Sequence, residues 1–153
     1  MSFNILLVED NIQKKDKILD FIKSIDSMNI VAIASSFTSG CQIVDNYGSE
    51  CDIILLDISL PTYDKNNLSP GGNFRSFAGK EIARKIIRKK MKMKIIFITQ
   101  YNSFSENRKS YNFQELKAEL IKDCKDNFLG MIQFDSTKEN WKIDLNKLIG
   151  DLS

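Results

Sequence analysis

The sequence predicts an α/β fold, a doubly wound parallel sheet of five strands with helices on both faces. Segments with strand character alternate five times with segments of helical periodicity, and such an alternation produces parallel neighbours joined by crossover connections. The strand segments include wholly apolar runs such as Ile53–Leu56, which are typical of strands buried on both faces.

Each element is predicted from its own pattern. Apolar and β-branched residues run together in the expected strands, at residues 3–8, 30–34, 51–56, 94–99 and 128–134. Apolar residues recur at helical spacing in the expected helices, at residues 12–25, 38–47, 78–90, 113–124 and in a last helix that follows residue 136. In the first helix the apolar set consists of Ile12, Ile18, Leu19, Ile22 and Ile25. Ser36 or Thr38 is a candidate N-cap of the second helix, and residues 136–139 are a candidate capping box for the last.

The composition is that of a globular protein. The 153 residues fit a single domain, 1–153, with 42% hydrophobic and 27% charged residues. A net charge of +2 does not indicate nucleic acid, and no apolar run is long enough for a bilayer or a signal peptide. Three cysteines without a CxxC pair favour reduced thiols and a cytoplasmic location. Histidine is absent, so the chain has no imidazole for catalysis or metal binding.

Two predicted loops are long for a domain of this size. They span residues 61–77 and 100–112, and loops beyond about a dozen residues are usually functional or disordered. Both follow strands, so both should emerge on the edge of the sheet where the strands end.

Acidic residues follow two of the apolar strands directly. Glu9 and Asp10 end the first, and Asp57 ends the third. Ligands of open α/β sheets collect beyond the carboxyl ends of the strands, so these carboxylates should meet if the two strands are neighbours. Three carboxylates repel one another unless a cation joins them, and a hard divalent ion such as Mg²⁺ prefers such oxygen ligands.

Residues 5–11 (ILLVEDN) and 52–61 (DIILLDISLP) resemble the receiver domain of two-component response regulators. The resemblance implies a flavodoxin-like sheet with strand order 2-1-3-4-5. It also implies that Asp57 is the phosphoacceptor, that Thr99 is the switch residue, and that Glu9 and Asp10 are the acidic pair. Mg²⁺ would then be held by Glu9, Asp10, Asp57 and the backbone carbonyl of Ser59.

The function implied by this resemblance is that of a stand-alone receiver in a phosphorelay. A histidine kinase or phosphotransfer protein would donate the phosphoryl group, and a downstream protein partner would dock on the fourth and fifth strands and helices. The chain would not be an enzyme beyond its own transfer and loss of the phosphoryl group.

One departure from the family pattern concerns a lysine at the end of the fifth strand. Phe134 stands there, or Gln133 if the alignment slips by one residue. Four loop cations are candidate substitutes: Lys65, Arg75, Arg108 and Lys109. The alternative is a pseudo-receiver, a protein-binding module that works without phosphorylation. Two other functions are disfavoured. A dehalogenase-like phosphatase would need a second aspartate where Ser59 stands. In a flavodoxin-like cofactor binder, the acidic pair after the first strand would repel the phosphate of the flavin.

Overall fold

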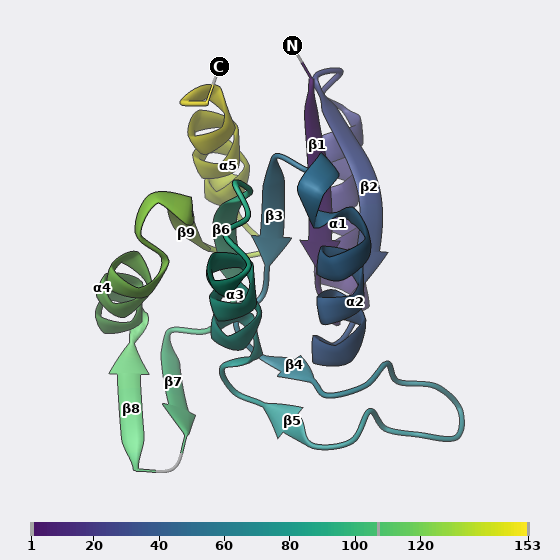
Figure 1. The fold of residues 1–153 in the computed structure, drawn as a ribbon, viewed down its shortest axis with the longest axis vertical. Coiled ribbons are helices and arrows are strands. Elements are labelled where there is room, and N and C mark those ends of the chain that lie inside the picture. Colours follow the sequence, from purple (N-terminus) through teal and green to yellow (C-terminus); the bar gives the residue numbers. More distant parts are fainter. Residues whose placement is uncertain (1, 107, 153) are drawn as a thin grey trace.

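The computed structural model describes residues 2–106 and 108–152 of the chain. At its centre a parallel sheet has the strand order β2-β1-β3-β6-β9, which is 2-1-3-4-5 when these five strands are counted along the chain (Figure 1). Its strands are β1 (Phe3–Val8), β2 (Met28–Ala34), β3 (Ile53–Leu56), β6 (Lys94–Thr99) and β9 (Phe128–Gln133). The predicted fold class and strand order are therefore confirmed.

Helices cover both faces of this sheet. The side chains of α1 (Ile12–Lys23) and α5 (Asn140–Gly150) pack into the core on one face. The other face is covered by α2 (Phe37–Tyr47), α3 (Ala78–Arg88) and α4 (Phe113–Cys124). Two short 3-10 turns, η1 (Gly48–Glu50) and η2 (Lys125–Asn127), lead into β3 and β9. In the described part of the chain, none of the helices has the length and hydrophobicity needed to cross a bilayer.

The strands are apolar at successive positions because both faces of the sheet are buried. In β1, Ile5 and Leu7 belong to the core under α1 and α5, while Leu6 and Val8 belong to the core on the opposite face. All four are at most 1% exposed. Alternate side chains of a strand point to opposite faces, so a doubly covered strand has no solvent-facing position.

The buried stripe of α1 differs from the one that the sequence predicted. Ile12 was expected on the apolar face, but it is 69% exposed. The buried residues of α1 are Lys14, Ile18 and Ile22, which follow one another at intervals of four residues. A lysine therefore occupies the first position of an otherwise apolar stripe.

The helix caps were predicted with mixed success. Ser36 is the N-cap of α2, as one of the two candidates, and its side chain accepts a hydrogen bond from the Ser39 N–H. The capping box expected at residues 136–139 is wrong, because α5 begins at Asn140 and its N-cap residue makes no side-chain cap bond. In its place the Asp135 carboxylate accepts hydrogen bonds from the N–H and the hydroxyl of Thr137.

Both long loops contain β-hairpins. In the first, β4 (Leu60–Pro61) pairs with β5 (Phe74–Arg75), and in the second, β7 (Ser103–Glu106) pairs with β8 (Lys109–Asn112). Figure 1 shows both hairpins at the lower edge of the molecule, toward which the arrows of β1 and β3 point. Both segments thus lie at the predicted edge, at the carboxyl ends of the strands.

Candidate functional site

The strand register brings three carboxylates together. Val8 lies opposite Leu56 in the pairing of β1 with β3, so the residues that follow both strands are neighbours. One oxygen each from Glu9, Asp10 and Asp57 lies within 4.8 Å of the others. The structure therefore gathers the three acidic residues that the sequence singled out.

Backbone contacts hold two of these residues in place. The Glu9 N–H donates to the carbonyl of Ala34, and the Asp57 N–H donates to the carbonyl of Val8 at 3.1 Å. The Asp57 side chain also accepts a bond of 2.7 Å from the N–H of Ile58, through Oδ1. Glu9 and Asp57 are buried, whereas Asp10 is partly exposed at the mouth of the site.

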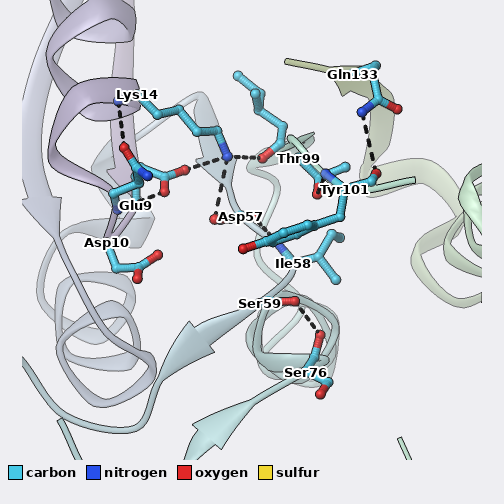
Figure 2. A network of polar contacts seen from close by, with 12 residues as sticks. Glu9, Asp10, Lys14, Asp57, Ile58, Ser59, Ser76, Thr99, Tyr101 and Gln133 are labelled. Atoms are coloured by element: carbon cyan, nitrogen blue, oxygen red, sulfur yellow. Dashed lines mark hydrogen bonds and ion pairs between the residues drawn. The ribbon is translucent and has the colours of Figure 1, made fainter. Parts of the chain in front are cut away.

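Lys14 reaches the same cluster from the first turn of α1 (Figure 2). Its Nζ lies 2.6 Å from Oε1 of Glu9 and 3.4 Å from Oδ2 of Asp57, and it donates a bond of 2.8 Å to the carbonyl of Ile98. The side chain is only 2% exposed. Lys14 is thus the cation that contacts Asp57.

The place expected for a lysine at the end of the fifth strand of the sheet is filled by aromatic packing. Phe134 follows β9, and its ring centroid lies 5.8 Å from Nζ of Lys14, close enough for a cation–π contact. The same ring lies 5.0 Å from Trp141 of α5, centroid to centroid. Gln133 is directed to the carbonyl of Tyr101, well apart from Lys14 in Figure 2.

Of the four loop cations expected as substitutes, Lys65 reaches the edge of the acidic cluster and the other three lie elsewhere. Lys65 is 3.8 Å from Asp10, on a side chain that is 58% exposed. Arg75 pairs with Glu81, while Arg108 and Lys109 line a groove beside α3 and α4. Within the described residues, Lys65 is the one of the four that pairs with the acidic cluster.

The sequence analysis missed Lys14, although two signals pointed to it. It stands four residues before Ile18 and eight before Ile22, the spacing of a buried stripe. It also lies three residues after the N-cap Asn11, in the first turn, and helical side chains point back toward the N-terminus. A lysine in that position is aimed at the residues that precede the helix, which here are Glu9 and Asp10.

Burial and repulsion from neighbouring carboxylates raise the pKa of Asp57 and of Asp10. Burial raises the pKa of Asp57 well above its usual range, Glu9 and Asp10 raise it further, and Lys14 opposes them. Burial and the neighbouring Glu9 also raise the pKa of Asp10, against Lys65 and Lys14. When all are ionised, three carboxylates and one buried ammonium leave two negative charges in excess.

A divalent cation fits this donor set in charge and in ligand type. Mg²⁺ binds carboxylate oxygens at about 2.1 Å, which places opposite ligands about 4.2 Å apart. The separations within 4.8 Å come close to that spacing. The hydroxyl of Ser59 donates to the carbonyl of Ser76 at 2.9 Å, and the metal contact expected from the Ser59 backbone carbonyl stays a prediction.

Thr99 lies at the end of β6, next to the carbonyl that Lys14 holds. It is fully buried, and its Oγ1 accepts a hydrogen bond of 3.2 Å from the N–H of Tyr101. The predicted switch residue is therefore placed between the lysine-bound end of β6 and the start of the β7–β8 hairpin.

A curated relative, and not a family model, shows the family of this chain. No family model matches the chain. The Detocs response regulatory protein DtcB of Enterobacter cloacae (strain JD6301) is 30% identical over 149 residues, which are 97% of this chain and 99% of that protein. An uncharacterized protein of Sinorhizobium fredii, y4jR, is 24% identical over 138 residues, 90% of each chain.

Solved receiver domains share the fold. The response regulator domain of CheB from Thermotoga maritima is 17% identical, with a TM-score of 0.67 over 98% of this chain and 96% of that one. CheY of Borrelia burgdorferi, solved with CheX, BeF₃ and Mg²⁺, is 18% identical, with a TM-score of 0.66 over 98% and 88% of the two chains. CheY6 of R. sphaeroides, solved with the P1 domain of CheA3, is 19% identical, with a TM-score of 0.66 over 99% and 98%. The likeness to DtcB shows that this chain belongs to the response regulator family, and the solved structures show that it has the fold of a receiver domain.

Proposed function

We propose that residues 1–153 act as one receiver domain that takes a phosphoryl group onto Asp57 and signals through a partner protein. The observation that carries this proposal is the convergence of Glu9, Asp10 and Asp57 at the ends of two neighbouring strands. When bound by these carboxylates and the Ser59 carbonyl, Mg²⁺ would neutralise charge on the phosphoryl oxygens during transfer.

The transfer uses the Asp57 carboxylate as the nucleophile. A carboxylate oxygen forms a bond to phosphorus while the bond from phosphorus to the donor nitrogen breaks, and its electron pair stays with the donor imidazole. The product is an acyl phosphate on Asp57. Because this chain has no histidine, the imidazole must come from another protein, a histidine kinase or a phosphotransfer protein. The complex of CheY6 with the P1 domain of CheA3 supports this kind of donor.

Thr99 is the residue that we assign to the switch. Its hydroxyl accepts a bond from Tyr101, and its own proton can be donated to a phosphoryl oxygen. A movement of Thr99 toward that oxygen would pull on the first residues of the β7–β8 segment. The output surface would then include this hairpin together with α4, β9 and α5.

The chemistry in this proposal is limited to the chain's own phosphoryl group. The protein gains it from a donor and loses it to water, and converts no other substrate. The three cysteines are free, which supports a reducing, cytoplasmic setting for this exchange.

Phosphorylation with a small donor tests the proposal directly. The protein is incubated with acetyl phosphate or phosphoramidate and Mg²⁺, and intact mass is recorded over time. We expect the mass of one phosphoryl group to be added to the wild type and to Asp16→Asn, an exposed control on α1, but not to Asp57→Asn. A wild type that stays unmodified by these donors and by a cognate kinase would refute the proposal.

The second candidate function is the pseudo-receiver, and one observation favours it. Both oxygens of Asp57 already have partners, Oδ1 in the N–H of Ile58 and Oδ2 in Nζ of Lys14. The Asp57 side chain is therefore held in position without a phosphoryl group. If the protein is a pseudo-receiver, Asp57→Asn should bind the downstream partner as tightly as the wild type. If it is a phosphoryl acceptor, the affinity for the partner should differ between the phosphorylated and the unphosphorylated protein.

A further inference from the structure

We propose that Lys14 of α1 is the catalytic cation of this receiver, which pairs with the phosphoryl group on Asp57 in place of a lysine at the end of β9. This inference rests on the proposed function, because it assigns a residue to the same transfer. The cation is thereby assigned to a helix, α1, and not to the end of the strand β9.

The contacts of Nζ suit this role. An ammonium group has three donor hydrogens, and three acceptors surround this one: Glu9, Ile98 and Asp57. The contacts with Glu9 and with the Ile98 carbonyl are short, at 2.6 and 2.8 Å, whereas the contact with Asp57 is 3.4 Å. Glu9 and the Ile98 carbonyl therefore fix the ammonium in position, and the longer third contact is with the carboxylate of Asp57, the group that reacts.

The position of Lys14 is compatible with a metal on the same carboxylate. In Figure 2 the Lys14 side chain passes Glu9 and its ammonium lies above the Asp57 carboxylate, whereas Asp10 lies below and to the left of that carboxylate. A phosphoryl group on Asp57 would then meet a divalent cation on the Asp10 side and an ammonium on the Lys14 side. Positive charge on both sides stabilises the equatorial oxygens of a phosphoryl group in transfer.

Packing alone does not account for a lysine here. Ile18 and Ile22 continue the same stripe as fully apolar contacts, and Phe134 and Trp141 offer an aromatic wall. Burying an ammonium costs free energy unless it is fully paired, and an apolar side chain in such a place is often as stable or more stable. The lysine is therefore explained by its polar contacts, which are Glu9, the Ile98 carbonyl and the Asp57 carboxylate.

The end of β9 is shaped to accept a cation from elsewhere. The Phe134 N–H donates a bond of 2.7 Å to the Thr99 carbonyl, which fixes the start of this segment beside the switch residue. The ring then lies 5.8 Å from Nζ and supports the ammonium by its π face. The positive charge of Lys14 therefore lies near the end of β9, where Phe134 stands in place of the expected lysine.

The proton balance of the step is simple. As the new bond from Asp57 to phosphorus forms and the donor bond breaks, Lys14 keeps all its protons. One of its N–H groups moves from the carboxylate to a phosphoryl oxygen. Because another N–H holds the Ile98 carbonyl, this movement acts on α1 and on the end of β6 together.

The first test compares variants that remove one positive charge from the same helix. Lys14→Met removes the cation from the site, and Lys17→Met removes an exposed cation whose Nζ donates to the Ser136 carbonyl at 3.2 Å. With acetyl phosphate and Mg²⁺, we expect phosphorylation of Lys14→Met to be slower by about 10²-fold, the effect of losing one donor to a developing anion. Lys17→Met should react at the wild-type rate. A wild-type rate in Lys14→Met would overturn the inference while leaving the proposed function intact, and an unreactive wild type would overturn both.

A second measurement separates a catalytic from a structural role. Removing an ammonium from an acidic cluster lowers the repulsion against Mg²⁺, so Lys14→Met should bind Mg²⁺ alone more tightly by about tenfold or more, measured by calorimetry. The same variant should bind beryllofluoride with Mg²⁺ more weakly. A loss of affinity for both ions would mean that the lysine holds the site together, and would overturn the inference.

A relocated lysine gives the last test. In the double variant Lys14→Met/Phe134→Lys the cation returns to the end of β9, and we expect at least about a tenfold recovery of the phosphorylation rate over Lys14→Met. Cooperative thermal unfolding of the double variant shows that it is folded. No recovery in a folded double variant would count against a role for charge at this place.

Discussion

Gly79 shows how closely single residues are fitted around Asp57. A Cβ atom at this position would lie 2.2 Å from the Asp57 carbonyl oxygen, on backbone that cannot move aside like a side chain. The N–H of Gly79 also donates to the Ile58 carbonyl at 2.8 Å. The start of α3 thus approaches the end of β3 as closely as glycine allows.

We expect Gly79→Ala to lower the free energy of unfolding by about 1–3 kcal/mol, the usual cost of forcing extra atoms into a packed site. The same change should slow phosphorylation, since the backbone of Asp57 must shift. Urea unfolding and the acetyl phosphate reaction measure the two effects. Gly150→Ala is the matched control, because a Cβ there meets nothing within 4 Å. Equal stability of both variants would contradict the close approach.

The cysteines should be nearly inert in the folded protein. Burial raises the pKa of Cys51 and of Cys124 to about 11, and burial also raises that of the partly exposed Cys41. A thiol with a pKa of 11 is about 0.1% thiolate at pH 8, and the thiolate is the reactive form. Iodoacetamide at pH 8 should therefore label native Cys51 and Cys124 far more slowly than the urea-unfolded chain, as followed by mass spectrometry. Rapid labelling of both in the native protein would contradict their burial.

Sequence patterns identified the acidic residues of the site but not its lysine, for a physical reason. Carboxylates that follow two apolar strands are placed by strand register, which the patterns determine. The cation comes from a helix, and many charged residues of that helix are compatible with a solvated face. Lys14 is distinguished only by its spacing, four residues before Ile18 and eight before Ile22. Because Ile12 was assigned to the buried stripe instead, this spacing was not recognised.

At the scale of elements, the β7–β8 hairpin is attached to the core mainly by Phe104 of β7, while Tyr111 of β8 packs against the same core from a partly buried position. Phe104 is 4% exposed, belongs to the core beneath α3 and α4, and meets Tyr101 edge to face at 6.5 Å between centroids. The hairpin can therefore respond to changes at Thr99, a few residues earlier, only as far as this anchor permits.

We expect Phe104→Ala to destabilise the protein by about 3 kcal/mol, at the low end for a buried phenylalanine because the site is at the periphery of the core. Amide exchange should become faster in β7 and β8 before it does in the central sheet. Phe74→Ala, in the other hairpin, makes the same chemical change at a side chain that is 57% exposed, and should leave both quantities unchanged within about 0.5 kcal/mol. Exchange that rises equally throughout the sheet would argue against a local anchor.

The large elements were predictable and the small ones were not. The five strands of the sheet have their own apolar runs, so their place and order followed from local pattern and the resemblance. The two hairpins are paired by contacts across a loop, and β4 and β5 are only two residues each, too short for a periodic signal. The last helix was predicted to begin with a capping box, whereas Asp135 binds Thr137 ahead of a later start.

At the scale of the whole molecule, the acidic site stores free energy that folding must supply. The fold buries Asp57 beside two other carboxylates because the strands that carry them are neighbours, and Lys14 offsets only part of the repulsion. A site that binds a cation or a phosphoryl group tightly is unfavourable when empty. Under the proposed function, stability, metal binding and phosphorylation are therefore linked.

The direction of this linkage with pH follows from the raised pKa values of Asp57 and Asp10. The ordinary value for both is 3.8, and the folded state holds these protons more tightly than the unfolded chain. Their contribution to stability is fully present below pH 3.8 and is lost as pH rises through the folded-state pKa values. Without Mg²⁺, this site thus makes the protein less stable at neutral than at mildly acidic pH.

Asp57→Asn should relieve this cost, because it removes one carboxylate while Lys14 keeps its 2.6 Å contact with Glu9. In EDTA at pH 7 we expect the variant to have the higher Tm, by about 2–4 °C, the shift that about 1 kcal/mol produces in a domain of this size. If the ionised site binds Mg²⁺ as proposed, Mg²⁺ at a hundred times its Kd would stabilise the wild type by about 2.7 kcal/mol, so the order of the two Tm values should reverse with added Mg²⁺. Differential scanning calorimetry with and without Mg²⁺ measures both. A lower Tm for Asp57→Asn in EDTA would mean that the charged aspartate stabilises the empty fold, and that the strain assigned to the acidic cluster does not exist.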